Sequence, residues 1–157
     1  MTDTEVTLKP ETPADVASAV LDAIEAQPDV FNMDHWAWLP DAIRLPPETA
    51  PACGSQLCAA GWAAHVTGWT LVSLPVEEQA EATGVDDDGD EHEELISVYA
   101  ERGEERRLIC DVAAKALGLK PSETFWYVDG PTALKRLREI AGRWPSPGRR
   151  TGGPKPA

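Results

Sequence analysis

The chain has few cysteines, few basic side chains and no long apolar run. Only three cysteines occur among its 157 residues. Small secreted scaffolds depend on several disulfides, and a transmembrane helix needs about 20 consecutive apolar residues. The shortage of both, together with the lack of a hydrophobic leader, argues against a disulfide scaffold, a membrane span and export. We therefore expect a soluble cytoplasmic protein.

Familiar catalytic motifs are also missing from the sequence. It has no phosphate-binding glycine loop, no Gly-x-Ser-x-Gly elbow and no His-Glu-x-x-His helix. No internal repeat is visible. The sequence therefore favours a non-enzymatic protein that needs no cofactor.

Acidic residues are abundant and unevenly distributed. The chain carries 27 acidic and 14 basic side chains, for a net charge of −13. Residues 77–105 hold thirteen acidic side chains against the single basic Arg102, whereas residues 131–157 hold seven basic side chains against the single acidic Glu139. The chain thus has a negative middle and a positive end, a pattern that suggests charged partners.

The length suits one domain with loose ends. We expect a flexible N-terminus over residues 1–11, a single helical domain over 12–144, and a disordered basic tail rich in proline and glycine over 145–157. The predicted fold is mainly α, a compact bundle of short helices with an aromatic-rich, proline-containing loop over 29–51. Residues 70–74 form at most a minor strand.

Hydrophobic periodicity and capping signals place the predicted helices. They span residues 13–27, 57–66, 75–83, 93–102, 104–117, 121–127 and 129–144, with a helical turn at 34–39. The first begins at an N-cap Thr12 followed by Pro13, and Gln27-Pro28 ends it.

The stretch from Cys53 to His65 is the centre of the predicted fold. Ser55 is a good N-cap for an alanine-rich helix over 57–66, and Gly68 falls where a left-handed C-cap belongs. A glycine inside a helix costs about 1 kcal/mol relative to alanine. Gly61 therefore predicts that another element, such as an indole ring, packs close to the helix backbone at that point.

Cys53, Cys58 and His35 are the candidates for a metal or thiol site. A zinc ion needs ligands that converge on one centre. Cys58 and His65 lie about 10 Å apart along a continuous helix, so the remaining ligands would come from His35, His92, Cys110 or a carboxylate. The cysteines could also form a disulfide, or one could act as a nucleophile with His35 as base. The favoured interpretation is that both are buried filler beneath the tryptophans.

The acidic run at 86–91 invites comparison with a calcium loop. With Asp86 first, the sixth position is Glu91 and the twelfth is Ser97; with Gly89 sixth, the first is Gly84 and the twelfth is Leu95. Neither register supplies both the glycine and the terminal glutamate that such a loop requires. The run is interpreted as a solvated acidic loop.

Two groups of residues resemble a family of small proteins common in actinobacteria and their phages. The first is Phe31-x-Met33-x-x-Trp36 followed by Cys53-Gly54-Ser55-x-x-Cys58-x-Ala60-Gly61-Trp62, similar to a core of Cys-Gly-Ser/Thr-x-x-Cys-x-Ala-Gly-Trp/His. The second is Leu117-Gly118-Leu119 followed by the aromatic pair Phe125-Trp126. The resemblance implies a related fold and an actinobacterial or phage origin, hence the host cytosol if the gene is phage-borne. It implies no mechanism.

The leading functional hypothesis is an acidic interaction or regulatory protein. It would bind a host or cellular protein with a basic surface, because complementary charge raises the rate of encounter. The predicted contact residues are Glu77, Glu78, Glu81, Asp86, Asp87, Asp88, Asp90, Glu91, Glu93 and Glu94.

Two alternatives remain open. One is the metal- or thiol-dependent site at Cys53 and Cys58. The other is nucleic-acid binding through the basic C-terminal helix and tail, where Arg136, Arg138, Arg143, Arg149 and Arg150 cluster. The acidity of the preceding residues makes nucleic acid the less favoured partner.

Overall fold

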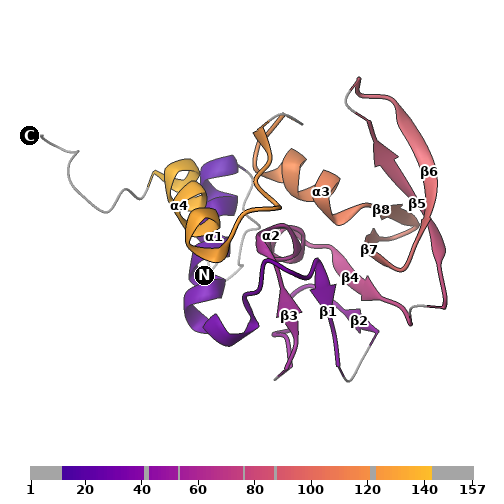
Figure 1. Ribbon diagram of the computed structural model, residues 1–157, viewed down its shortest axis with the longest axis horizontal. Helices are drawn as coiled ribbons and strands as arrows, with labels where there is room; N and C mark the ends of the chain where they lie inside the picture. Colours follow the sequence, from indigo (N-terminus) through magenta and orange to yellow (C-terminus); the bar gives the residue numbers. More distant parts are fainter. Residues whose placement is uncertain are drawn as a thin grey trace, which may run out of the picture.

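The fold combines helices with two sheets (Figure 1). The computed structural model describes residues 12–40, 43–52, 54–75, 77–86, 88–120 and 123–142. The helices are α1 (Pro13–Ala26), the short 3₁₀ turn η2 (Pro28–Val30), α2 (Ala59–Val66), α3 (Ile109–Ala116) and α4 (Gly130–Ala141). The strands are β1 (Ala37–Trp38), β2 (Arg44–Leu45), β3 (Gln56–Leu57), β4 (Thr70–Ser73), β5 (Ala80–Val85), β6 (Glu91–Ile96), β7 (Val98–Arg102) and β8 (Glu105–Arg107). The prediction of a mainly α bundle is therefore wrong, and the fold is mixed α/β.

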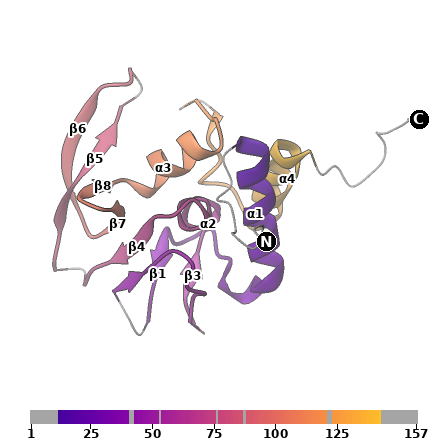
Figure 2. The ribbon, with the colours of Figure 1, turned by 180° about the vertical axis from the view of Figure 1, so that it is seen from behind.

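Helices α1 and α4 pack side by side at one end of the molecule (Figures 1 and 2). The predicted start of α1 is confirmed, because the Thr12 hydroxyl accepts a hydrogen bond from the Asp15 amide at 3.1 Å and Pro13 opens the helix. In α4 the Asp129 carboxylate caps the Thr132 amide at 3.0 Å. Local side-chain caps thus define both N-termini, as expected when free amides need acceptors.

Helix α2 lies in the middle of the core. Every residue from 59 to 65 is buried. Its N-cap is Cys58 rather than the predicted Ser55, since the Cys58 sulfur accepts the Gly61 amide at 3.5 Å. The predicted glycine at its C-terminal end is confirmed, with Gly68 at φ +99°.

Gly61 is the point of closest approach to α2. A Cβ atom built on it would lie 2.3 Å from the carbonyl oxygen of Trp36, in the segment just before β1. The predicted close packing at this glycine is confirmed, but the neighbour is backbone and not an indole ring. The residue preceding β1 can therefore rest directly on the helix.

The main sheet has six strands in the order β2-β4-β7-β8-β5-β6. Neighbours are antiparallel except β5 and β8, which pair in parallel through Thr83 and Arg107. On one face Leu71 and Ala100 join the main core with α2 and α3. On the other face Val72, Tyr99 and Ala82 form a second small core. Strands β1 and β3 make a separate two-stranded ribbon.

The acidic middle of the chain is where the predicted helices are wrong. Residues 80–85, within and just after the predicted helix 75–83, are β5. The predicted helix 93–102 is replaced by most of β6 and by β7, and the start of the predicted helix 104–117 is β8. The predicted turn at 34–39 contains β1. The predicted minor strand is confirmed as β4, but it lies inside the sheet between β2 and β7. Short charged strands lack the alternation of apolar and polar residues that distinguishes a strand from a helix. Hydrogen bonding to neighbouring strands determines their conformation instead.

We predict that Gly61→Ala destabilises the protein by about 1–3 kcal/mol, because the added methyl group overlaps the Trp36 carbonyl and the ribbon must move. In an open helix the same change would stabilise by about 1 kcal/mol. Urea denaturation of both proteins measures the difference. Equal or greater stability of the variant would contradict the close approach.

Candidate partner-binding surface

The predicted acidic contact residues gather on the β5–β6 hairpin and the loop before it. Glu77 and Glu78 lie in the loop, Glu81 on β5, Asp86, Asp88 and Asp90 in the connecting turn, and Glu91, Glu93 and Glu94 on β6. All nine are exposed. Asp87, the tenth, lies outside the described residues. In both ribbon views the hairpin stands at the side of the molecule away from α1 and α4 (Figures 1 and 2).

The hairpin turn explains the run of aspartates. The Asp86 carboxylate accepts hydrogen bonds from the amides of Asp88 and Asp90, at 3.0 and 2.9 Å. Gly89 has φ +87°, and its amide donates to the Asp86 carbonyl. Asp86 is therefore occupied in shaping the turn, as short acidic side chains commonly are.

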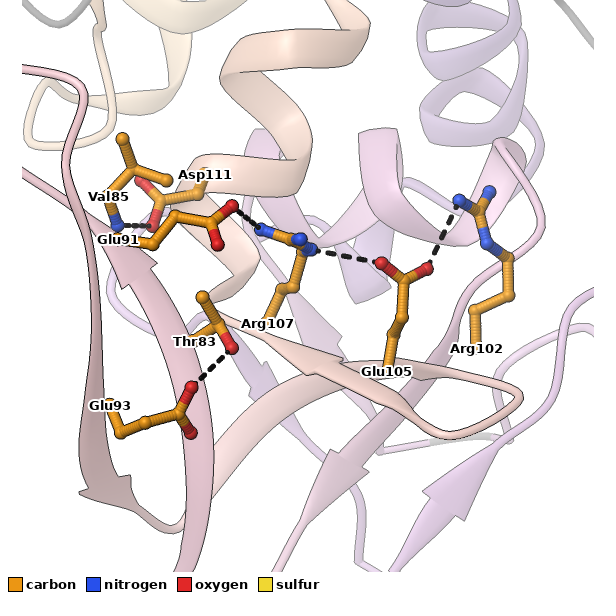
Figure 3. Close-up of polar contacts among 8 residues, drawn as sticks. All are labelled: Thr83, Val85, Glu91, Glu93, Arg102, Glu105, Arg107 and Asp111. Carbon is orange, nitrogen blue, oxygen red and sulfur yellow. Dashed lines mark hydrogen bonds and ion pairs between the residues drawn. The ribbon is translucent and has the colours of Figure 1, made fainter.

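A polar depression of about 370 Å³ lies beside the hairpin. Its lining combines four carboxylates, two guanidinium groups and a hydroxyl: Glu81, Glu93, Glu104, Glu105, Arg106, Arg107 and Thr83. Figure 3 shows how part of this lining converges from β5, β6 and β8. The carboxylates exceed the cations in this depression, so it favours a positively charged group.

Arg107 forms ion pairs with two of the nearby carboxylates, so a net negative charge remains. It lies 3.2 Å from Glu91 and 3.3 Å from Glu105, and Arg102 reaches Glu105 at 3.6 Å (Figure 3). The guanidinium of Arg107 thereby ties β6 to β8 across the strand between them. This bridge holds the wall of the depression in place.

Three other carboxylates, those of Glu81, Glu93 and Glu104, can still bind a cation. The Glu93 carboxylate accepts a hydrogen bond from the Thr83 hydroxyl at 2.8 Å but has no ion pair with any described residue. Nor do Glu81 and Glu104 have an ion-pair partner in the part of the chain that the structure describes. Because these three side chains are exposed, pairing with an incoming cation removes little of their hydration.

The opposite face of the hairpin carries a pair formed by His92 and Glu94. His92 Nε2 lies 2.6 Å from the Glu94 carboxylate, and this hydrogen bond raises the pKa of His92 above its usual value. The Asp111 carboxylate accepts the Val85 amide at 2.9 Å, joining α3 to β5. Partial burial raises the pKa of Asp111. The Asp111–Val85 hydrogen bond therefore fastens the hairpin to α3.

Sequence reasoning identified the acidic residues of the hairpin but missed Thr83, Glu104, Glu105, Arg106 and Arg107. The tight turn after Arg102 carries the signal that could have revealed them. Gly103 has φ +61° there and only two residues separate β7 from β8. A glycine first in a two-residue loop is typical of a β-hairpin.

The thiol candidates lie elsewhere. Cys58 is a free thiol, 1% exposed, and burial raises its pKa to about 11. His35 is exposed, and Cys53 lies outside the described residues. Among the described residues no three histidine, cysteine or acidic side chains are grouped so that they could hold a metal ion. A reactive cysteine needs a lowered pKa and access, and Cys58 has neither.

His65 has a structural contact instead. Its Nε2 lies 3.2 Å from the Pro46 carbonyl oxygen and 2.9 Å from that of Thr49, so this nitrogen carries the proton and donates it. The contact ties the proline-containing loop, where Glu48 has φ +70°, to α2. Desolvation lowers the pKa of His65 below its usual value.

Of the basic residues named in the nucleic-acid hypothesis, Arg136 and Arg138 are described, and both lie on α4. Arg136 pairs with Glu139 at 3.1 Å and lies 5.7 Å from the Phe125 ring. Arg143, Arg149 and Arg150, which the nucleic-acid hypothesis needs, lie outside the described residues.

Comparison with known proteins supplies no further assignment. No protein-family model, curated protein or solved structure matches the chain. The resemblance to small actinobacterial and phage proteins stays a prediction. In the described ranges no helix has both the length and the apolar character needed to cross a membrane.

We predict that the protein loses stability as the pH falls below about 6.5. The pKa of His65 is lower in the folded chain than in the unfolded chain, so below this pH the unfolded chain binds the proton more readily. The loss continues until the pH reaches the lowered pKa of the folded state. His65→Gln should flatten this part of the stability curve, measured by urea denaturation between about pH 7 and pH 5.

His92→Gln is the matched control for this measurement. The pKa of His92 is raised in the folded protein, so His92 contributes stability at acid pH that is lost as the pH rises through its folded pKa. Its removal should steepen the acid loss. Parallel curves for the wild type and His65→Gln would show that His65 is not the titrating group.

Proposed function

We propose that this protein is an interaction protein that captures a partner protein through a lysine- or arginine-rich surface. The observation that supports this proposal is the depression beside β6, where the carboxylates of Glu81, Glu93 and Glu104 have no ion-pair partner among the described residues. A cation from a partner would meet three negative groups on a folded support.

The support distinguishes this surface from an ordinary solvated acidic run. Glu81 and Glu93 stand on paired strands, and Arg107 braces β6 against β8. Charges held in place lose less entropy when they bind than charges on a mobile segment. Their field also accelerates encounter with a basic partner, most strongly at low salt.

Solubility alone would not require this arrangement. A dispersed negative charge keeps a protein soluble wherever the charges lie. Here carboxylates from β5, β6 and the β7–β8 turn converge on one depression. Convergence of like charges opposes folding, so a ligand of opposite sign is the natural counterpart.

We predict that the triple change Glu81→Gln, Glu93→Gln and Glu104→Gln weakens binding of a fluorescent octalysine peptide by about tenfold, since each exposed ion pair contributes a few tenths of a kcal/mol to about 1 kcal/mol. Fluorescence anisotropy at low ionic strength measures the affinity.

The control variant removes the same charge far from the hairpin, through Glu25→Gln, Asp29→Asn and Asp34→Asn. These residues are exposed around the end of α1 and η2. Binding by this control should change by less than about threefold. Equal weakening of the two variants would show that only net charge matters and would overturn the proposed site.

A further inference from the structure

Strand β6 is an open edge of the main sheet. It ends the strand order and pairs only with β5 among the described residues. All six of its residues follow the ladder in register, with no bulge, proline or glycine. In both ribbon views it forms the outer boundary of the sheet (Figures 1 and 2). Such an edge presents free amides and carbonyls in a row.

The other edge of the sheet is closed to a further strand. Strand β2 has two residues and runs straight into Pro46 and Pro47. Proline removes the amide that pairing requires, and short edge strands offer few partners. The contrast between the two edges singles out β6 as the place where an extended segment can be added.

The direction of the free groups on β6 follows from the hydrogen bonds of its neighbours. The Asp86 amide donates to the Asp90 carbonyl, so this pair faces inward across the hairpin. Inward and outward residues alternate along an antiparallel ladder. His92, Glu94 and Ile96 therefore face β5, and the backbone groups of Glu91, Glu93 and Leu95 point outward.

Contacts on the far side of β5 agree with this alternation. The Thr83 carbonyl accepts the Leu108 amide and the Val85 amide donates to Asp111, so both residues direct their backbone away from β6. Their register partners are Glu93 and Glu91. The outward direction on β6 is thus supported from both strands of the hairpin.

Side chains along this edge select the partner. An added strand would place residues opposite Glu91, Glu93 and Leu95, on the face that carries the depression. Basic side chains fit opposite the two glutamates and can reach into the depression, while Leu95, 61% exposed, can cover an apolar neighbour. Pairing with β6 of a second copy would set glutamates against glutamates, which is unfavourable.

We propose that β6 binds its partner by main-chain strand addition, and that the partner is an extended protein segment with lysine or arginine at alternate positions. The proposal rests on the proposed capture of a basic protein and states how that capture takes place. Backbone hydrogen bonds along the outer edge supply affinity, and the glutamates beside the depression supply the preference for basic side chains.

Two octapeptides of equal charge test the proposal in the wild-type protein. One alternates lysine with threonine, and the other alternates Nα-methyllysine with proline, which keeps the charge and favours an extended chain but has no main-chain amide donor at any position. Strand addition predicts that the threonine peptide binds about tenfold more tightly, because the other peptide cannot donate main-chain hydrogen bonds to β6 in either strand direction. Anisotropy at low ionic strength gives both affinities.

Leu95→Pro and Leu95→Thr form a matched pair on the protein side. Neither changes the charge, and the Leu95 amide that proline removes points away from β5, so the ladder within the hairpin is kept. Leu95→Pro should weaken binding of the threonine peptide a few-fold and so reduce the preference, because one of the three outward amides is lost, whereas Leu95→Thr should keep it. Circular dichroism checks that both variants are folded.

Amide exchange measured by NMR in the wild type gives an independent readout. On addition of the threonine peptide, the amides of Glu91, Glu93 and Leu95 should become protected, and those of His92 and Glu94 should change little. Lack of protection in the saturated complex, or equal affinities for the two peptides, would overturn strand addition.

The outcomes separate the two proposals. Equal binding of both peptides that is weakened by the triple glutamate change leaves the acidic capture surface standing and removes strand addition. Failure of both peptides to bind at low salt would remove both. Self-association of the free protein that Leu95→Pro abolishes would make a second copy the occupant and would also overturn the proposal.

Discussion

The burial of α2 is the constraint on which the rest of the structure depends. Five of the eight residues of α2 are alanine or glycine, so neighbouring elements can approach its backbone closely. The Trp36 carbonyl lies over Gly61, Leu71 and Ala100 of the main sheet share its core, and α1 and α3 pack against it. The two sheets, α1 and α3 thus pack around one central helix, α2. A larger side chain at Gly61 would force its neighbours apart.

Because the main core surrounds α2, the far end of the main sheet contributes few apolar side chains to it. Five of the six residues of β6 are exposed, and on β5 only Ala82 and Gly84 are buried. Hydrophobic burial at this hairpin is limited to its base, where Ala80, Ala82 and Ile96 join the second small core. Its register is maintained by backbone pairing, by the Arg107 bridge to Glu91 and by the Asp111 contact with Val85. Side chains that need not fill a core are free to carry charge for another purpose.

The sequence predicted those parts of the fold that local interactions decide. Thr12-Pro13 and Asp129 are caps that act within a single turn, and α1 and α4 begin where expected. The β5–β6 hairpin depends on pairing between strands, and Glu91 to Glu94 hide the alternation because both faces of β6 are hydrated. Between β5 and β8, only the turns at Asp86 to Asp90 and at Gly103 carried a local strand signal. Composition likewise singled out most of the acidic residues proposed as contacts, but which carboxylates converge with Arg107 depends on the order of β8, β5 and β6.

Charge on β6 has two consequences that arise from the same physics. An open edge strand tends to pair with any other strand, and folded proteins commonly prevent this with charged side chains. Lysine is the usual choice, whereas β6 carries Glu91, Glu93 and Glu94. Negative charge repels a second copy of this acidic chain and most other acidic proteins, yet it attracts a basic segment. In the proposed strand addition, the residues that protect the edge from aggregation also define which partner it accepts, so protection and recognition need no separate surface.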